Sequence, residues 1–296
     1  ELSNWALFRS PQIVQFDTTT ERPMVLINAD NDKGKTSLFY AIRYVLFGER
    51  GLKTHPRKDA KNLNEWANFY SARDGDGEIS VELKIELNDG SVRRIQRKRK
   101  FFQTPTGETI ELEPKDQVTI FDEHEPIELG KDSREINKWI EKNTLPFGAS
   151  QFLFADLDGS EGFFNPDYNY LLEGGLKENL VNEDVVNEMN IILGKFENRH
   201  KFLDDKFRLI DGELKFGKHV WAAGEQIILS LIFILGVRNI HAPDSFLVID
   251  GLGRLDWRDR ENALKLLFEN VSQLILLTPI DDPDVSKFFT QSLFLD

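Results

Sequence analysis

The sequence predicts an α/β fold built around a phosphate-binding loop, and three observations support that prediction. The run 24–27 is continuously apolar, as in a buried parallel strand. Residues 29–36, Ala-Asp-Asn-Asp-Lys-Gly-Lys-Thr, follow it closely, and 37–47 has the pattern of an amphipathic helix. A second apolar run, 246–249, ends in Asp250. A strand, a glycine-containing loop and a helix in this order form an architecture that binds nucleotide phosphates.

The loop residues match the roles that phosphate binding requires. In such a loop the backbone N–H groups point at the phosphates, a lysine reaches the β- and γ-phosphates, and the next hydroxyl holds Mg²⁺. Asp32 stands where many such loops have glycine, and Asp adopts a left-handed backbone more readily than most residues. The alternative, a chance Gly-Lys-Thr in an ordinary loop, is disfavoured by the flanking patterns. The loop residues expected to bind nucleotide are Asn31, Asp32, Lys33, Gly34, Lys35, Thr36 and Ser37.

Composition limits the classes of protein to which the chain can belong. Its 296 residues can form one large α/β domain or two ordinary ones, and the absence of cysteine excludes disulfides and thiolate metal sites. The formal net charge of −13 argues against nucleic-acid binding over the whole surface, so any DNA contact must be local. The longest apolar run, 227–237, is too short to span a bilayer. We therefore expect a cytoplasmic protein with no membrane partner.

One local candidate for DNA contact is a basic β-hairpin. Residues 79–87 alternate apolar and charged side chains, 88–90 (Asn-Asp-Gly) is a hairpin turn, and 91–102 returns with many basic residues. Two interpretations stay open. The hairpin either follows a DNA backbone or is solvated, with charges that keep an edge strand soluble. The candidate DNA contacts are Arg93, Arg94, Arg97 and Arg99.

The order of the expected elements alternates strands and helices in both halves of the chain. A turn-rich segment at 163–176, with Asn-Pro and Gly-Gly, separates the halves. Strands are expected at 5–16, 24–27, 246–249 and 274–277, an antiparallel meander at 77–113, a hairpin at 207–216, and helices at 37–47, 133–142, 179–196, 224–237 and 258–269.

Two further segments carry chemistry. A buried parallel strand that ends in Asp is how phosphate-loop enzymes place a carboxylate beside Mg²⁺, so Asp250 is the candidate. The alternative is an Asp that only caps the following turn. Residues 221–226 place small side chains before a long helix, whose free N–H groups attract anions. This motif is weaker, because small residues also begin ordinary buried helices.

Together these residues resemble the ATP-binding heads of the ABC-type ATPase superfamily, in the branch of SMC proteins, SbcC-like repair ATPases, RecF-like proteins and DndD. Phe8-Arg9-Ser10 is similar to the family's N-terminal Phe-Arg-Ser, whose arginine approaches the phosphates, and 31–36 matches its Walker A loop. Gln151 stands at the place of the Q-loop glutamine, which senses Mg²⁺ and the γ-phosphate. The signature motif corresponds to Ala222, Ala223, Gly224 and Glu225, Walker B to Asp250, and the D-loop to 252–256, which ends in Asp256.

The resemblance implies a fold and a set of roles. The fold is a P-loop NTPase, an ABC-ATPase-like head with an antiparallel β meander in the N-terminal lobe and a mainly parallel core sheet shared by N- and C-terminal segments. ATP and Mg²⁺ are the implied cofactors, with Arg9 among the nucleotide contacts. The implied catalytic residues are Lys35, Gln151 and Asp250, and the implied Mg²⁺ ligands are Thr36, Gln151 and Asp250.

The lobes of this superfamily are separated by a long antiparallel coiled coil. No stretch of this chain sustains heptads, and about seventy residues between the Q-loop and signature positions are too few for a long arm. We expect lobes at 1–174 and 175–296, in a head from which the arm has been removed near 174–175. The stretch 152–159 and Gly-Arg-Leu-Asp at 253–256 look most like DndD-type proteins.

The resemblance also implies a mechanism in which two heads dimerise around ATP, each nucleotide lying between Walker A of one and the signature motif of the other. Three positions depart from the family pattern. Gly251 replaces the glutamate after the Walker B aspartate, Ala222 replaces the signature serine, and Thr278 stands where a histidine is common. We therefore expect slow or partner-stimulated hydrolysis.

Two functional hypotheses follow. The first is a DNA-processing ATPase head in repair, DNA modification or antiphage defence, with DNA and nuclease or DNA-modifying subunits as partners. The alternative is a non-hydrolysing, ATP-dependent dimerisation switch that recruits partner proteins. A transporter ATPase fits the start of the chain less well.

Overall fold

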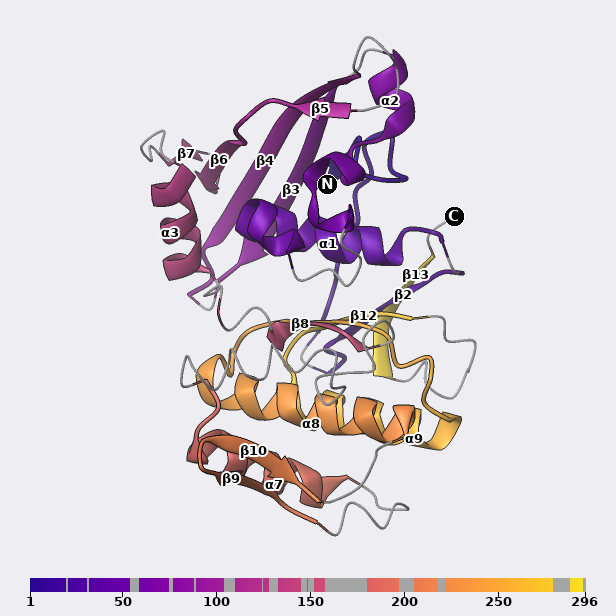
Figure 1. Cartoon of the computed structure of the whole chain (residues 1–296), viewed down its shortest axis with the longest axis vertical. Coiled ribbons are helices and arrows are strands. Elements are labelled where there is room, and N and C mark those ends of the chain that lie inside the picture. Colours follow the sequence, from indigo (N-terminus) through magenta and orange to yellow (C-terminus); the bar gives the residue numbers. More distant parts are fainter. Residues whose placement is uncertain are drawn as a thin grey trace. The chain divides into compact units, whose positions relative to one another are not determined.

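The computed structural model describes residues 1–19, 21–30, 32–53, 59–74, 77–87, 89–103, 110–123, 125–127, 133–144, 148, 152–157, 180–196, 205–217, 222–278 and 288–294. The chain forms two compact units (Figure 1). The first comprises Glu1–Gln15 and Asn31–Phe147, and the second comprises Phe16–Asp30 and Gly148–Asp296.

An antiparallel sheet forms the body of the first unit. Its alternating sequence buries one face, for example Ile79, Val81 and Ile95, and leaves charged residues on the other. The predicted hairpin is confirmed, with strand register running from Glu78↔Lys100 to Glu86↔Val92. The strand order is β1 (Leu2–Ser3), β3 (Glu78–Glu86), β4 (Val92–Gln103), β6 (Gln117–Asp122) and β7 (Glu125–Pro126), and β5 (Ile110–Leu112) also pairs with β4.

Helix α1 (Lys35–Phe47) packs on β3 and β4 of this sheet (Figure 1). Its residues from Leu38 to Phe47 are all buried, because the helix is covered on several sides. It ends at Gly48, whose φ of 62° is left-handed. The smaller elements are 3-10 helices η1 (Gly48–Leu52), η2 (Asp59–Lys61) and η3 (Leu63–Trp66), with α-helices α2 (Phe69–Asp74) and α3 (Ser133–Asn143).

A parallel sheet forms the core of the second unit. Its middle strands are fully buried and are apolar except at their last residues Asn28 and Asp250, as expected for parallel strands covered on both faces. The pairings among its described strands are all parallel. This confirms the predicted core sheet shared by N- and C-terminal segments. The order is β13 (Phe289–Phe294), β2 (Met24–Asn28), β12 (Leu274–Leu277), β11 (Leu247–Asp250) and β8 (Phe154–Asp156).

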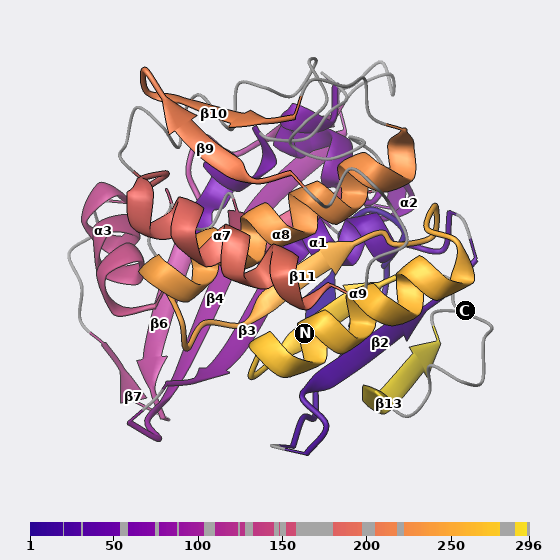
Figure 2. The same ribbon diagram turned by 90° about the horizontal axis from the view of Figure 1, so that it is seen from below.

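The helices of the second unit are seen best in Figure 2. Helix α8 (Ala223–His241) contacts α9 (Trp257–Asn270) and α7 (Glu183–Lys195), and α7 carries the hairpin of β9 (Phe207–Ile210) and β10 (Glu213–Phe216). Gly236 lets α7 approach α8 closely, since a Cβ there would lie 2.5 Å from Cγ of Met189. Among the described helices, α8 has the length and apolar character to cross a membrane, but most of it is buried inside the protein, as in a core helix.

The structure departs from the sequence predictions in several places. The strand predicted at 5–16 does not form. Residues 5–8 are a tight turn in which Trp5 pairs with Phe8, and 9–16 contain an isolated bridge from Gln12 to Leu2. Strand β13 was not predicted, since its sequence shows neither alternation nor a continuous apolar run. The predicted lobe boundary at 174–175 lies outside the described residues. The compact units follow a different division, because β2 pairs with the C-terminal strands β12 and β13.

Candidate nucleotide-binding site

The predicted phosphate loop connects β2 of the second unit to α1 of the first. Its glycine and one of its aspartates have left-handed backbones, with φ of 92° at Gly34 and 64° at Asp32. The sequence predicted that Asp32 could take this conformation in place of a glycine, and the structure confirms it. Asn31 lies outside the described residues.

The first turn of α1 has the character of an anion site. It contains no acidic residue, and its N-cap Gly34 offers no side-chain hydrogen bond. The first N–H groups of a helix lack partners within the helix, and they lie at its positive end. Lys35 and Ser37 are partly exposed there and Thr36 is exposed. Lys33 and Asp32 are exposed in the loop before them.

Phe8 and Arg9 lie in the N-terminal turn of the same unit. A Cβ at Gly34 would lie 2.8 Å from Cζ of Phe8, so the phenyl ring rests on the loop glycine. Arg9, the predicted phosphate contact, is exposed and follows Phe8 directly. The structure therefore brings Phe8, the chain neighbour of Arg9, to the phosphate loop.

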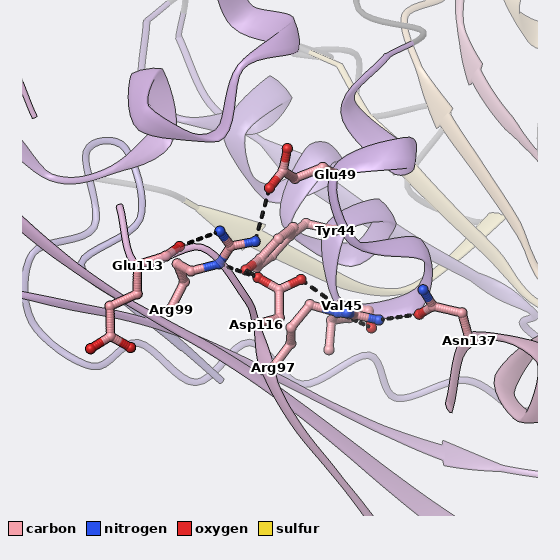
Figure 3. Close-up of polar contacts among 8 residues, drawn as sticks. All are labelled: Tyr44, Val45, Glu49, Arg97, Arg99, Glu113, Asp116 and Asn137. Carbon is pink, nitrogen blue, oxygen red and sulfur yellow. Dashed lines mark hydrogen bonds and ion pairs between the residues drawn. The ribbon is translucent and has the colours of Figure 1, made fainter. Parts of the chain in front are cut away.

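A buried polar network supports the C-terminal half of α1 (Figure 3). The Asp116 carboxylate accepts hydrogen bonds from the Tyr44 hydroxyl at 2.7 Å, from Arg97 at 3.0 Å and from Arg99 at 2.6 Å. Arg97 also donates to the Val45 carbonyl of α1. Burial, and then the Asp116 carboxylate, raise the pKa of Tyr44 well above its ordinary value. The Asp116 carboxylate is thus shared by two buried guanidinium groups.

Arg97 and Arg99 also donate hydrogen bonds to segments around Asp116. Arg97 donates to Asn137 of α3 at 3.0 Å, and Arg99 donates to Glu49 of η1 at 2.8 Å and to the Glu113 carbonyl at 2.6 Å. The network also explains Gly48, where a Cβ would lie 3.2 Å from Nη1 of Arg97. Together these contacts fix the C-terminal end of α1 to β4, α3 and the segment before β6.

This network corrects the predicted DNA contacts. Arg97 and Arg99 are only 1% and 6% exposed, and their hydrogen bonds are made inside the fold, so their burial contradicts a contact with a DNA backbone. Strand alternation places both on the face of Ile95, a signal that the sequence already contained.

The other two arginines of the predicted DNA surface are partly exposed and paired. Arg93 forms an ion pair with Asp122. Arg94 lies 3.8 Å from a carboxylate oxygen of Glu82, and its guanidinium sits 3.9 Å from the centre of the Phe121 ring. Each of these two arginines therefore has an acidic neighbour, which favours the interpretation of a solvated hairpin.

The second unit presents Asp250 at the C-terminal edge of its parallel sheet. Asp250 is in register with Asp156 of β8 on one side and Leu277 of β12 on the other, and it is buried. Ligands of open α/β sheets bind outside the carboxyl ends of the strands, so this is the expected edge. Gln151, predicted to act beside it, lies outside the described residues.

The residue after Asp250 is a buried glycine rather than a carboxylate. Gly251 has a φ of 115° and its N–H donates to the Leu277 carbonyl at 3.0 Å. Leu252 has a φ of 145° and is fully buried. The two residues after Asp250 are therefore buried. Gly251 stands where the family resemblance implies a glutamate.

Thr278 extends β12 at the same edge. Its N–H donates to the Ile27 carbonyl of β2 at 3.2 Å, and the residue is completely buried. Among the described residues its hydroxyl has no hydrogen-bond partner. A buried hydroxyl without a partner is uncommon in a native fold, and this property of Thr278 could not be read from its match to the family's histidine position.

The predicted signature residues form the start of α8. Ala222 is exposed at the N-cap, and the Glu225 carboxylate accepts a hydrogen bond from its N–H at 2.8 Å. This is half of a capping box, because alanine has no side-chain acceptor. A Cβ at Gly224 would make only an ordinary contact with Leu255, so local packing does not require glycine there. Ala223 begins the helix.

Asp256, the predicted D-loop residue, caps helix α9. One of its carboxylate oxygens accepts from the N–H groups of Arg258 at 3.0 Å and Asp259 at 2.9 Å. This capping role was not predicted, although Asp before a helix is a typical N-cap. Within the described part of the chain, no group of three or more His, Cys, Asp or Glu residues forms a metal cluster.

Comparison with solved structures identifies the class of fold. An SMC head domain from Thermotoga maritima has a TM-score of 0.52 at 18% identity, covering 98% of this chain and 91% of that one. An SMC head bound to the C-terminal winged-helix domain of ScpA has a TM-score of 0.51 at 14% identity, covering 95% and 88%. The fold is that of a P-loop NTPase of the ABC-ATPase head type.

The sequence comparisons give the family. Residues 1–219 match the AAA_23 family, described as an AAA domain, and the chain belongs to that family. A curated relative, the SbcC component of nuclease SbcCD from Staphylococcus haemolyticus (strain JCSC1435), is 28% identical over 142 residues. The match covers 48% of this chain and 13% of the relative, so the chain corresponds to a small part of that protein. The chain is therefore an AAA-family domain that has the fold of an SMC head and a partial sequence similarity to SbcC.

Proposed function

We propose that this chain binds MgATP and hydrolyses it slowly, as the head of a DNA-processing ATPase. The observation that carries the proposal is the phosphate loop, in which left-handed Gly34 leads directly into a helix start that lacks acidic residues. In this proposal Lys35 reaches the β- and γ-phosphates and the backbone N–H groups of the loop hold their oxygens. Membership of an ATPase family supports it.

Magnesium fits the donors that the chain offers. Mg²⁺ prefers oxygen ligands, and it usually binds through one or two carboxylates together with substrate phosphates. The proposed donors are the Asp250 carboxylate and the Thr36 hydroxyl, with Gln151 as the predicted third ligand. Asp250 is buried at a strand end, where a single carboxylate is held in place.

Slow turnover follows from the chemistry at Gly251. A water oxygen would attack the γ-phosphorus while the bond to the β–γ bridging oxygen breaks and ADP leaves with its electron pair. The proton of that water passes to a phosphate oxygen when no base is present. Gly251 and Leu252 provide no carboxylate to orient the water, so positioning and charge neutralisation supply the catalysis.

The alternative function is a switch that binds ATP and dimerises without hydrolysis. Gly251 and Ala222 favour it, because the first removes a carboxylate and the second a hydroxyl at the signature position. In both proposals the partner is a second copy of the head, joined through the signature residues Ala222, Ala223, Gly224 and Glu225 and the segment ending in Asp256. ATP stabilises such a dimer by mass action.

The wider role is proposed from the relatives. The name of the SbcCD relative supports a nuclease subunit as a partner, and the ScpA-bound SMC head supports a protein partner at the head. We propose a cytoplasmic protein acting on DNA in repair, DNA modification of the DndD type or antiphage defence. We also propose that a coiled-coil arm has been removed from this head near residues 174–175.

The test is phosphate release from MgATP by the protein, by Lys35→Ala and by Lys84→Ala, with the molar mass followed in parallel. Lys84 lies exposed on β3 and is the matched control for loss of a lysine charge. Turnover lost only in Lys35→Ala supports the ATPase. ATP-dependent dimerisation without turnover supports the switch. Absence of nucleotide binding by the unmodified protein contradicts both.

A further inference from the structure

The N-terminal turn is strained and tightly hydrogen-bonded. Trp5 and Phe8 exchange backbone hydrogen bonds at 3.0 and 2.8 Å, and Leu2 and Gln12 do the same at 2.9 and 2.8 Å. Inside this turn Asn4 and Ala6 have φ of 53° and 47°, a left-handed conformation that alanine rarely adopts. Such strain persists only where the surrounding structure fixes the backbone, and it is commonest at functional sites.

Buried polar side chains hold the strained backbone. The Asn68 side chain donates to the Ala6 carbonyl at 2.7 Å, and the Ala6 N–H donates to the Trp66 carbonyl at 2.6 Å. The Asn4 side chain donates to the Glu78 carbonyl at 2.9 Å and accepts from the Ser71 hydroxyl at 2.6 Å. These contacts therefore hold the turn at both of its left-handed residues, Asn4 and Ala6.

Trp5 connects this turn to the phosphate-loop helix. Its indole N–H donates to the Ser37 carbonyl, in the first turn of α1, at 2.8 Å. Its ring is fully buried and stacked between Tyr44 of α1 at 5.1 Å and Trp66 at 5.2 Å between ring centres. Three residues later, Phe8 rests on Gly34. The turn thus touches the helix start through Trp5 and the loop through Phe8.

We propose that Trp5 is a positioning residue for nucleotide binding, which holds the turn carrying Arg9 at a fixed distance from the first turn of α1. The inference rests on the proposed binding of MgATP. Trp5 is buried, so it acts through the two segments that it joins rather than by touching the nucleotide. Its hydrogen bond to Ser37 couples the two segments, because the phosphates would meet Arg9 from one and backbone N–H groups from the other.

The chain offers a matched control in Trp66. Trp66 is also buried, belongs to the same aromatic stack, and donates its indole N–H to the Ala60 carbonyl at 2.7 Å. Ala60 lies in η2, outside the phosphate loop. Trp5→Phe and Trp66→Phe therefore remove the same group from similar surroundings and should lower the melting temperature by similar amounts.

MgATP affinity separates the two variants, measured by fluorescence anisotropy of a labelled nucleotide well below either melting temperature. We expect Trp5→Phe to bind roughly three- to tenfold more weakly, the equivalent of one hydrogen bond, and Trp66→Phe to bind like the unmodified protein. The second part of the experiment measures the MgATP affinity of Arg9→Ala and of the double variant with Trp5→Phe. If Trp5 acts through Arg9, Trp5→Phe should cost little further affinity once Arg9 is alanine.

Equal affinities in the two tryptophan variants, or additive losses for Trp5→Phe and Arg9→Ala, would overturn the inference while leaving the proposed function intact. Absence of MgATP binding by the unmodified protein would overturn both. If Trp5→Phe does not fold, replacing each tryptophan with 3-benzothienylalanine removes only the N–H and keeps the shape of the ring. The same comparison of affinities then decides.

Discussion

The phenyl ring of Phe8 occupies the space that a side chain at Gly34 would need, because a Cβ there would lie 2.8 Å from Cζ of Phe8. Gly34 is thus constrained twice, by a φ of 92° and by this ring. The conformation of the phosphate loop therefore depends on its own glycine and on Phe8 of the N-terminal turn.

Gly34→Ala should therefore destabilise the protein more than the backbone strain alone explains. Gly90→Ala is the matched control, since Gly90 has a φ of 80° in the same unit and nothing within 4 Å of its Cβ position. Left-handed strain should cost both variants about 1–2 kcal/mol in the free energy of unfolding. A further loss in Gly34→Ala alone, measured by urea unfolding, checks the contact with Phe8. Equal losses of unfolding free energy in Gly34→Ala and Gly90→Ala would show that the Phe8 ring moves aside without cost.

Asp116→Asn should be strongly destabilising. It leaves two buried guanidinium groups, those of Arg97 and Arg99, without their shared carboxylate, and breaking a buried ion pair in this way costs about 3–5 kcal/mol. Asp122→Asn removes a carboxylate from the exposed pair with Arg93 on the same sheet, and should cost at most about 1 kcal/mol. Denaturant midpoints of the two variants give the comparison. A loss below about 1 kcal/mol for Asp116→Asn would contradict the role of the network.

Stability should fall at alkaline pH in part through Tyr44. Burial and the Asp116 carboxylate raise the pKa of Tyr44 in the folded protein, whereas an unfolded tyrosine has a pKa of about 10. The stability that depends on the neutral phenol is therefore fully present below pH of about 10, and it is lost as pH rises further. Unfolding free energies of Tyr44→Phe and the unmodified protein, compared between about pH 8 and 11, should show a shallower decline in the variant. If the unfolding free energies of both proteins decline in parallel, Tyr44 is not a source of the alkaline loss of stability.

Thr278→Val should leave the free energy of unfolding unchanged or raise it by up to about 1 kcal/mol. The valine keeps the volume of the side chain and removes a buried hydroxyl that has no partner among the described residues. Thr278→Ser keeps the hydroxyl and loses a methyl, so it should cost about 1 kcal/mol. Thermal or urea unfolding of both variants tests the pair. A loss above about 1 kcal/mol in Thr278→Val would mean that the hydroxyl is hydrogen-bonded in solution.

The elements with strong local patterns could be predicted from the sequence. The runs that became β2, β11 and β12 are short and continuously apolar, and α8 and α9 have clear helical lengths, so the positions of these elements along the chain followed from periodicity. The sheet that the strands share was implied by the family resemblance. The left-handed Asp32 followed from the chemistry of its side chain. These features depend on neighbours in the sequence.

Features that depend on distant neighbours could not be predicted in the same way. Strand alternation places Arg97 and Arg99 on the face of Ile95, but the partners that allow their burial, Asp116 and Tyr44, are known only from the fold. The turn at Asn4 and Ala6 depends on Asn68 and Ser71, more than sixty residues away. Which compact unit each segment joins likewise depends on pairing between remote strands.

The position of β2 between β12 and β13 has a consequence for how the protein is made. Met24 pairs with Leu274 on one side and Phe289 on the other, so its partners are synthesised roughly 250 residues later. At about 5–20 residues per second, a ribosome leaves this apolar strand unpaired for roughly 12–50 s. The long sequence separation also makes closure of the sheet a slow event. The nascent chain is thus most exposed to aggregation at β2, and chaperone binding to the emerging N-terminal third would protect it.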